Sequence, residues 1–195
     1  MSTPAMTIEP RHHRLTRATD TLHEHLHILV ASLAPFESRE NYARFVSAQY
    51  IFQREIEPLY QRPALQALLP DLPERSRRAA AAADLTDLGQ ALPQVEPDIA
   101  DVLNVPHAVG WMFVAEGSTL GAAVLLKRVR PLGLNESFGA RHLAPHPIGR
   151  AKHWKRFSDA LDALELSEED DAEVISGARA AFEHFGDLLT RVRGV

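Results

Sequence analysis

The feature that most constrains the fold of this chain is an apolar run that carries three glycines. Residues 110–123 read GWMFVAEGSTLGAA, and they form the middle of a helix predicted over residues 107–130. A helix as apolar as this one must be buried. Each glycine costs a helix about 1 kcal/mol relative to alanine, so the three together cost about 2–3 kcal/mol. A cost of this size indicates that something needs close access to the helix backbone.

Helical periodicity places Gly110, Gly117 and Gly121 on one face, with Ser118 beside them. A face without side chains allows either a second helix or a large flat ligand to approach the backbone. Small residues at such spacing are a common device for packing helices together. The spacing alone therefore favours helix packing and leaves the ligand as the alternative.

Bulk composition bounds the class of protein. The chain has 195 residues, of which 45% are hydrophobic, and this suits one globular domain. It has no cysteine, which excludes disulfides, thiolate metal sites, a cysteine nucleophile and covalent heme attachment. The net charge of −5 argues against nucleic-acid binding, which usually needs a broad basic face.

The chain shows no sign of membrane targeting. The N-terminus from Met1 to Pro10 lacks the apolar core of a signal peptide. No run reaches the roughly 18 apolar residues that a membrane span needs. We therefore expect a soluble, cytoplasmic protein without a membrane partner.

Strand patterns are weak, whereas alanine and leucine recur at helical spacing throughout the chain. We predict an all-α, single-domain helical bundle over residues 14–195, preceded by a flexible arm over residues 1–13. Ser38 and Ser167 are predicted N-caps, the latter in an acidic capping box with Asp170. The predicted helices cover residues 15–33, 38–59, 64–69, 74–83, 107–130, 151–164 and 167–192.

A cluster of histidines on the first predicted helix is the main candidate for a metal site. His23 and His27 are four residues apart, a spacing that can hold one metal. A di-iron bundle needs Glu-x-x-His pairs on two partner helices, and the two matches to that motif, at Glu9 and Glu24, both lie in the N-terminal region. A single neutral imidazole that binds a metal held in a macrocycle fits better. Periodicity does not choose among His23, His25 and His27.

Four stretches, in this order and spacing, resemble bacterial heme oxygenases of the Pseudomonas-type and bacteriophytochrome-associated kinds. They are His23 on the first helix, Phe45-Val46-x-x-Gln49-Tyr50 on the second, residues 110–123, and Asn135-Glu136-Ser137-Phe138-Gly139-Ala140-Arg141-His142-Leu143. The resemblance runs from about residue 15 to the last predicted helix. It implies an all-α fold with heme between the first helix and the glycine-bearing helix.

The resemblance assigns roles that spacing left open. It implies that His23 is the proximal iron ligand and that the backbone at Gly117 and Gly121 lies over the iron on the distal side. The flat ligand is then the reason for the glycines, and the bare face leaves the sixth iron position for dioxygen. Ser118 stands where some family members carry an aspartate that anchors the distal water. We therefore expect Gly117, Ser118 and Gly121 to act in catalysis.

The implied reaction uses heme as both cofactor and substrate. Dioxygen, activated as a ferric hydroperoxide, cleaves the ring to biliverdin, carbon monoxide and ferrous iron. A ferredoxin-like protein or a reductase is the implied electron donor, docking at the basic segment 141–156, and a bacteriophytochrome is a candidate acceptor of biliverdin. The alternatives are a non-catalytic heme carrier or sensor of the same fold, and a metal-dependent oxidase.

Further positions carry expectations from the resemblance. Phe113 and Phe182 are expected to contact the heme, and the candidates for the heme propionates are Arg17, Lys127 and Arg128. His27 stands where several relatives place a glutamate that holds the ligand imidazole. Ala31 stands where the Pseudomonas-type pattern has a lysine, and we therefore expect cleavage at the usual α-meso carbon.

Overall fold

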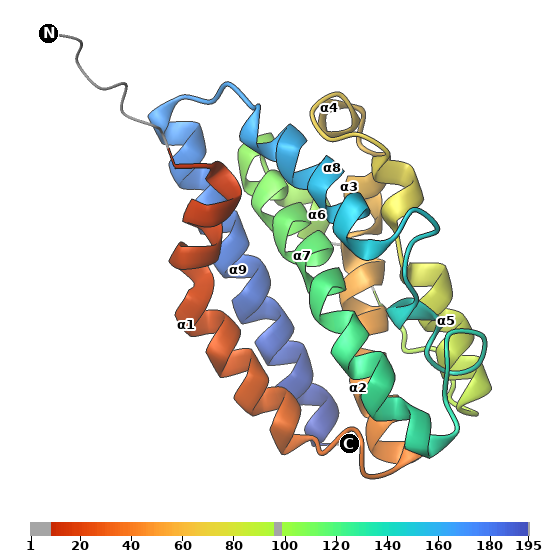
Figure 1. Ribbon diagram of the computed structural model, residues 1–195. Coiled ribbons are helices and arrows are strands. Elements are labelled where there is room, and N and C mark those ends of the chain that lie inside the picture. Colours follow the sequence, from red (N-terminus) through yellow and green to blue (C-terminus); the bar gives the residue numbers. More distant parts are fainter. Residues whose placement is uncertain (1–8, 96–98, 195) are drawn as a thin grey trace, which may run out of the picture.

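The computed structural model describes residues 9–95 and 99–194, which fold into the expected all-α bundle (Figure 1). The α-helices are α1 (Arg11–Ser32), α2 (Arg39–Glu55), α3 (Glu57–Gln61), α4 (Pro63–Gln66), α5 (Arg78–Asp87), α6 (Ile99–Val102), α7 (Val105–Val129), α8 (Arg150–Asp162) and α9 (Glu168–Arg193). Three-residue and four-residue 3₁₀ turns supplement them: η1 (Leu72–Arg75), η2 (Arg130–Leu132) and η3 (Arg141–Leu143).

The C-terminal helix α9 organises the bundle. It lies between α1 and α7, and all three helices run in the same direction (Figure 1). Both α1 and α7 pack along α9, which also contacts α2. The first helix and the glycine-bearing helix therefore flank the same central helix, although many residues separate them in the sequence.

The α7–α9 contact brings two backbones together. A Cβ atom added at Gly110 would lie 2.1 Å from the carbonyl oxygen of Val174, and one added at Gly177 would lie 2.0 Å from the carbonyl oxygen of His107. Real side chains do not tolerate such distances, so both positions require glycine. Helix packing is therefore the reason for the first of the three glycines on α7.

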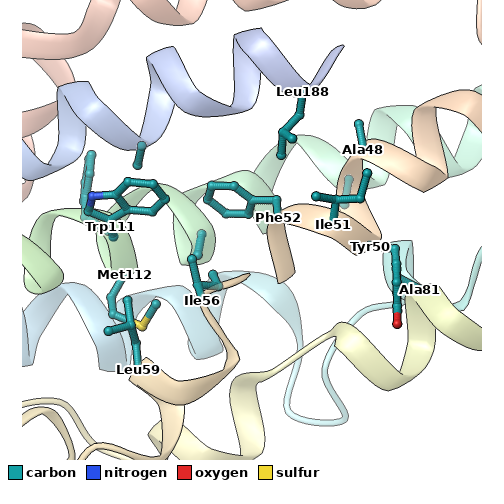
Figure 2. Close-up of a cluster of buried hydrophobic side chains, with 14 of the residues drawn as sticks. Ala48, Tyr50, Ile51, Phe52, Ile56, Leu59, Ala81, Trp111, Met112 and Leu188 are labelled. Atoms are coloured by element: carbon teal, nitrogen blue, oxygen red, sulfur yellow. The ribbon is translucent and has the colours of Figure 1, made fainter. Parts of the chain in front are cut away.

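Aromatic side chains of α2 and α7 fill the interior. Phe52 stacks on Trp111 with ring centroids 5.8 Å apart, and Ile56, Leu59 and Met112 pack beside them (Figure 2). Met112, Ile56 and Leu59 are fully buried. This packing fixes α7 against α2. The buried side of α7 that makes this contact is distinct from the side that carries its exposed residues Leu120 and Val124.

Helix boundaries agree with the sequence where a cap or proline marks them. The backbone N–H groups of Asn41 and Asp170 donate to the predicted caps Ser38 and Ser167 at 3.1 and 3.0 Å. The bounds predicted for the helix over 74–83 are wrong: residues 72–75 form η1, and α5 runs from Arg78 to Asp87. The alanine run has no cap that marks its start, and the prediction placed the helix too early.

The flexible arm predicted over residues 1–13 also needs correction. Residues 1–8 lie outside the described part, but α1 already begins at Arg11. The buried Arg11 side chain donates to the Asp171 carboxylate at 2.7 Å and to the carbonyl oxygen of Leu161 at 2.6 Å. Arg14 pairs with the same carboxylate. These partners are distant in sequence, so the local pattern did not reveal that they order the first turn.

One segment, Val105–Leu132, is long and apolar enough to span a membrane. However, 61% of its most apolar window is buried inside the bundle. Its apolar character is therefore accounted for by its place in the core between α2, α8 and α9.

We predict that Gly177→Ala destabilises the protein by about 2 kcal/mol or more, because the new methyl group forces α7 and α9 apart. Gly121→Ala is the matched control, since a Cβ there meets no atom within 4 Å. It should leave stability unchanged or raise it by up to about 1 kcal/mol through helix propensity. Urea unfolding of both variants measures this. Equal stability of Gly177→Ala and the parent would contradict the backbone contact.

Candidate functional site

His23 presents an exposed imidazole on α1. Its ring lies edge-on to Phe182 of α9, with centroids 6.0 Å apart, and edge-on to His27 at 4.5 Å. Partial burial and the neighbouring His27 lower the pKa of His23, with Asp20 and Glu24 opposing the shift. A lowered pKa favours the neutral imidazole, which is the form that binds iron.

Across α9, α7 presents a surface that we call the glycine face, formed by Gly117, Leu120, Gly121 and Val124. A Cβ added at Gly121 would meet nothing within 4 Å, and one added at Gly117 would meet only the Trp154 ring, at 3.8 Å. Leu120 and Val124 beside them are 45% and 61% exposed. Apolar side chains around a bare backbone fit a flat, apolar ligand such as a porphyrin.

The three glycines of α7 therefore serve two purposes. Gly110 touches the backbone of α9, whereas Gly117 and Gly121 leave their part of the same helix side uncovered. The helix-packing interpretation is confirmed at Gly110, whereas the ligand interpretation stays a prediction at Gly117 and Gly121. The structure brings the uncovered glycines to the same central helix as His23 and Phe182.

The second predicted aromatic contact lies deeper. Phe113 is only 6% exposed, and its ring packs against that of Trp154 on α8, with centroids 5.9 Å apart. Trp154 in turn lies over Gly117. Phe113 thus supports the edge of the glycine face, and its contact with heme stays a prediction.

The three predicted propionate partners do not form one group. Arg17 pairs with Glu9 at 2.8 Å on the surface. The Arg128 guanidinium lies 3.9 Å above the Phe36 ring, and Lys127 is exposed. Arg17 precedes His23 along α1 while the other two follow Gly121 along α7, and these helices run in the same direction (Figure 1). The candidates therefore lie toward opposite ends of the site.

A buried ion pair that the sequence analysis missed lies directly beside the glycine face. Glu116 and Arg75 are 2% and 3% exposed, and Arg75 Nη1 lies 2.9 Å from Glu116 Oε2. Tyr60 donates to the other carboxylate oxygen at 3.3 Å, and Arg75 also donates to the carbonyl oxygen of His153 at 3.2 Å. Burial raises the pKa of Glu116, and Arg75 opposes that shift. This pair ties α7 to η1 and α8 at the residue before Gly117.

Ser118, on the other side of Gly117, borders a small cavity of about 30 Å³ that polar and apolar side chains line together. The Ser118 hydroxyl donates to the carbonyl oxygen of Ala115 at 2.7 Å, so its oxygen can still accept a hydrogen bond. A cavity of this size holds one or two water molecules. Its lining comes from α2, α5, α7, η3 and their neighbours: Gln49, Gln53, Arg77, Ala81, Ser118, Ala122, Leu125, His142 and Leu143.

These lining groups had only a partial signal in the sequence. Gln49 belongs to the stretch that resembles the heme oxygenase pattern, and Ser118 was a candidate because of its place beside Gly117. Gln53 lies on the same helix as Gln49, and Arg77 comes from a separate segment. His142 lies in the stretch 135–143, which also resembles the heme oxygenase pattern. Tertiary contact alone assembles them, so spacing along the chain could not reveal them.

The family model for heme oxygenase matches residues 11–191 of the chain. The chain is 50% identical over 182 residues to heme oxygenase PigA of Pseudomonas aeruginosa, covering 93% of this chain and 92% of that protein. It is 34% identical over 118 residues to a heme oxygenase of Xanthomonas campestris, covering 59% of this chain and 68% of that protein.

Solved structures agree with these sequence relatives. The NO- and CO-bound heme oxygenase of Neisseria meningitidis superposes with a TM-score of 0.88 at 38% identity, covering 95% of this chain and 93% of that chain. A heme oxygenase of Leptospira interrogans, at 17% identity, gives a TM-score of 0.72 and covers 94% of this chain and all of that one. The second match shows likeness of fold alone.

We predict that Arg75→Met lowers the free energy of unfolding by about 3–5 kcal/mol, because it leaves the Glu116 carboxylate buried without its partner. The double variant Arg75→Met/Glu116→Leu should recover a large part of that loss, since no charge is then left buried. Denaturant unfolding of the parent, the two single variants Arg75→Met and Glu116→Leu, and the double variant measures the coupling. Additive effects of the two substitutions would contradict the ion pair.

Proposed function

The chain belongs to the heme oxygenase family, and from that premise we propose where its substrate binds and which residues act on it. The enzyme takes heme as both cofactor and substrate. When bound, heme supplies the iron that activates dioxygen and the ring that is opened to biliverdin, with release of carbon monoxide and ferrous iron. The observation that carries the assignment is the uncovered glycine face on α7, which shares α9 with the exposed His23 of α1.

On the proximal side, His23 binds the iron through a neutral imidazole. Its lowered pKa supports this role, because a smaller fraction of the imidazole is protonated and so prevented from binding iron. Phe182 holds the ring from α9, in edge contact at 6.0 Å. His27, whose ring touches that of His23 edge-on, takes the place that a glutamate has in several relatives.

On the distal side, the backbone at Gly117 and Gly121 approaches the porphyrin and leaves room for dioxygen. A side chain at Gly121 would project into this space, since no protein atom lies within 4 Å of the Cβ position. Ser118 links this side to the small cavity, where ordered water between its polar lining groups supplies protons. The described part of α7 thus separates an apolar binding face from a polar interior.

An enzyme fits this chain better than a carrier or sensor. The family match covers most of the chain, and the relative at 50% identity is itself named as a heme oxygenase. The cavity beside Ser118 is the part that turnover needs and that storage of heme does not. The carrier remains the second candidate, because it would use the same face and the same ligand.

The reaction draws electrons from a separate protein, and we propose a ferredoxin-like protein or a reductase as the donor. We further propose a bacteriophytochrome as the acceptor of biliverdin. The predicted docking surface for the donor, segment 141–156, has part of its positive charge neutralised by carboxylates of the same protein. Arg141 pairs with Asp84 and Asp87, and Lys155 and Arg156 pair with other carboxylates of the protein. The donor therefore finds less free positive charge there than the sequence suggested.

We predict that His23→Ala removes the proximal ligand, so that hemin added to the variant shows an altered Soret band and no biliverdin forms. His25→Ala and His27→Ala are matched controls on the same exposed stretch of α1. Both should keep the ligand spectrum of the parent. Absorption spectra of hemin-loaded protein, followed by reduction in air, measure both properties. Loss of the spectrum in either control would reassign the ligand.

The biliverdin isomer reports how the heme is rotated. We expect the α isomer from the parent enzyme. Both propionates leave one edge of the porphyrin, so only one of the two cation groups can hold them. Either Arg17→Ala or the pair Lys127→Ala/Arg128→Ala should change the isomer ratio, and the other should leave it unchanged. Chromatography of the product decides this. A shift in both variants, or in neither, would refute the assignment of these cations.

A further inference from the structure

His142 is the most unusual group in the cavity behind the distal helix. It is 5% exposed, and its Nδ1 lies 2.7 Å from Asp84 Oδ2. The other ring nitrogen, Nε2, is buried and has no hydrogen-bond partner among the described residues. A buried polar atom without a partner costs about 1–3 kcal/mol, so something must satisfy it. Since His142 lines the cavity, a water molecule there is the fitting partner.

Asp84 determines which nitrogen carries the proton. It is fully buried, and it also accepts hydrogen bonds from the backbone N–H groups of Arg141 and His142 at 2.8 and 2.9 Å. The Asp84 carboxylate also accepts a hydrogen bond from His142 Nδ1, which places the ring proton on that nitrogen. Nε2 is then left with a lone pair that is buried beside the cavity.

The same cavity reaches the distal helix beside the glycine face. Ser118 lines it, and this residue is adjacent to Gly117. Its hydroxyl hydrogen is committed to the carbonyl oxygen of Ala115, so a cavity water can donate to Ser118 Oγ. The cavity thus connects an imidazole lone pair at one end with the catalytic side of α7 at the other.

We infer that the Asp84–His142 pair is a proton-relay site for the heme reaction. His142 takes a proton at Nε2 from one cavity water and returns it to the water beside Ser118, so the imidazole is unchanged after each cycle. Asp84 stabilises the transient imidazolium. Arg77 donates to the carbonyl oxygen of His142 at 2.8 Å, and its positive charge keeps the lifetime of the imidazolium short. This inference rests on the proposed heme position against the glycine face. His142 acts through water and is a positioning residue.

The tautomer is tested first, in protein without heme. Nitrogen-15 spectra of the parent should show His142 with a protonated Nδ1 and an unprotonated Nε2, and Asp84→Asn should abolish this preference. A proton on Nε2 in the parent would overturn the relay, because the lone pair would then be absent. This measurement uses the parent protein, so it remains decisive if a variant does not fold.

Turnover separates a relay from a structural role. His142→Asn keeps a donor for Asp84 but has no group that can pass a proton. We expect reductant-driven heme consumption in air to slow by about 10-fold or more, with a changed solvent isotope effect. Turnover driven by hydrogen peroxide should stay within about twofold of the parent, since peroxide carries both the electrons and the protons. Heme affinity should not change.

The matched control is His107→Asn. His107 also faces a carboxylate, with Nδ1 3.4 Å from Glu173, but does not line the cavity. It should leave both rates unchanged. Equal slowing of both routes by His142→Asn, or slowing of neither, would overturn the relay. Failure of the parent protein to bind heme against the glycine face would instead refute the proposed function, so the two failures are distinguishable.

Discussion

The backbone contact between α7 and α9 sets the geometry of the whole site. At Gly110 and Gly177 the two helices touch without intervening side chains. At Gly117 and Gly121 the same side of α7 is uncovered. One helix face therefore provides both a direct backbone contact with α9 and an uncovered stretch of backbone, and α9 fixes the relative position of this face and the His23 imidazole.

The buried Arg75–Glu116 pair holds α7 from the opposite direction. Charges removed from water contribute little net stability, because desolvation offsets their attraction. Their effect here is positional: Glu116 precedes Gly117, and Arg75 and Tyr60 fix its carboxylate from two other segments. The backbone at Gly117 thus stands between the buried ion pair, which defines its place, and the glycine face, where we propose that heme binds. In the proposed site, this separation keeps proton-bearing groups close to the heme without placing them in the path of dioxygen.

Sequence patterns sufficed for the all-α class, the caps at Ser38 and Ser167, and the importance of the glycines on α7. They did not suffice where the cause was tertiary. The start of α1 depends on Asp171, far along the chain, and the α5 boundary had no cap to mark it. The cavity is assembled from residues on separate segments, and no pattern in the sequence indicated that Gln53 and Arg77 would join Gln49, Ser118 and His142 there. Periodicity describes one helix at a time, so a site made between helices escapes it.

Leu120 and Val124 are exposed in the protein without heme, so we expect its free energy of unfolding to depend on how much of its substrate is bound. A compound that binds only the native chain raises the free energy of unfolding with its concentration, by roughly 2.7 kcal/mol at 100 times its dissociation constant. In the proposed site, heme that covers these two apolar side chains therefore stabilises the folded protein. Each turnover removes the bound heme that stabilised the enzyme. We therefore expect the lifetime of the enzyme in a cell to rise and fall with the amount of heme that it degrades.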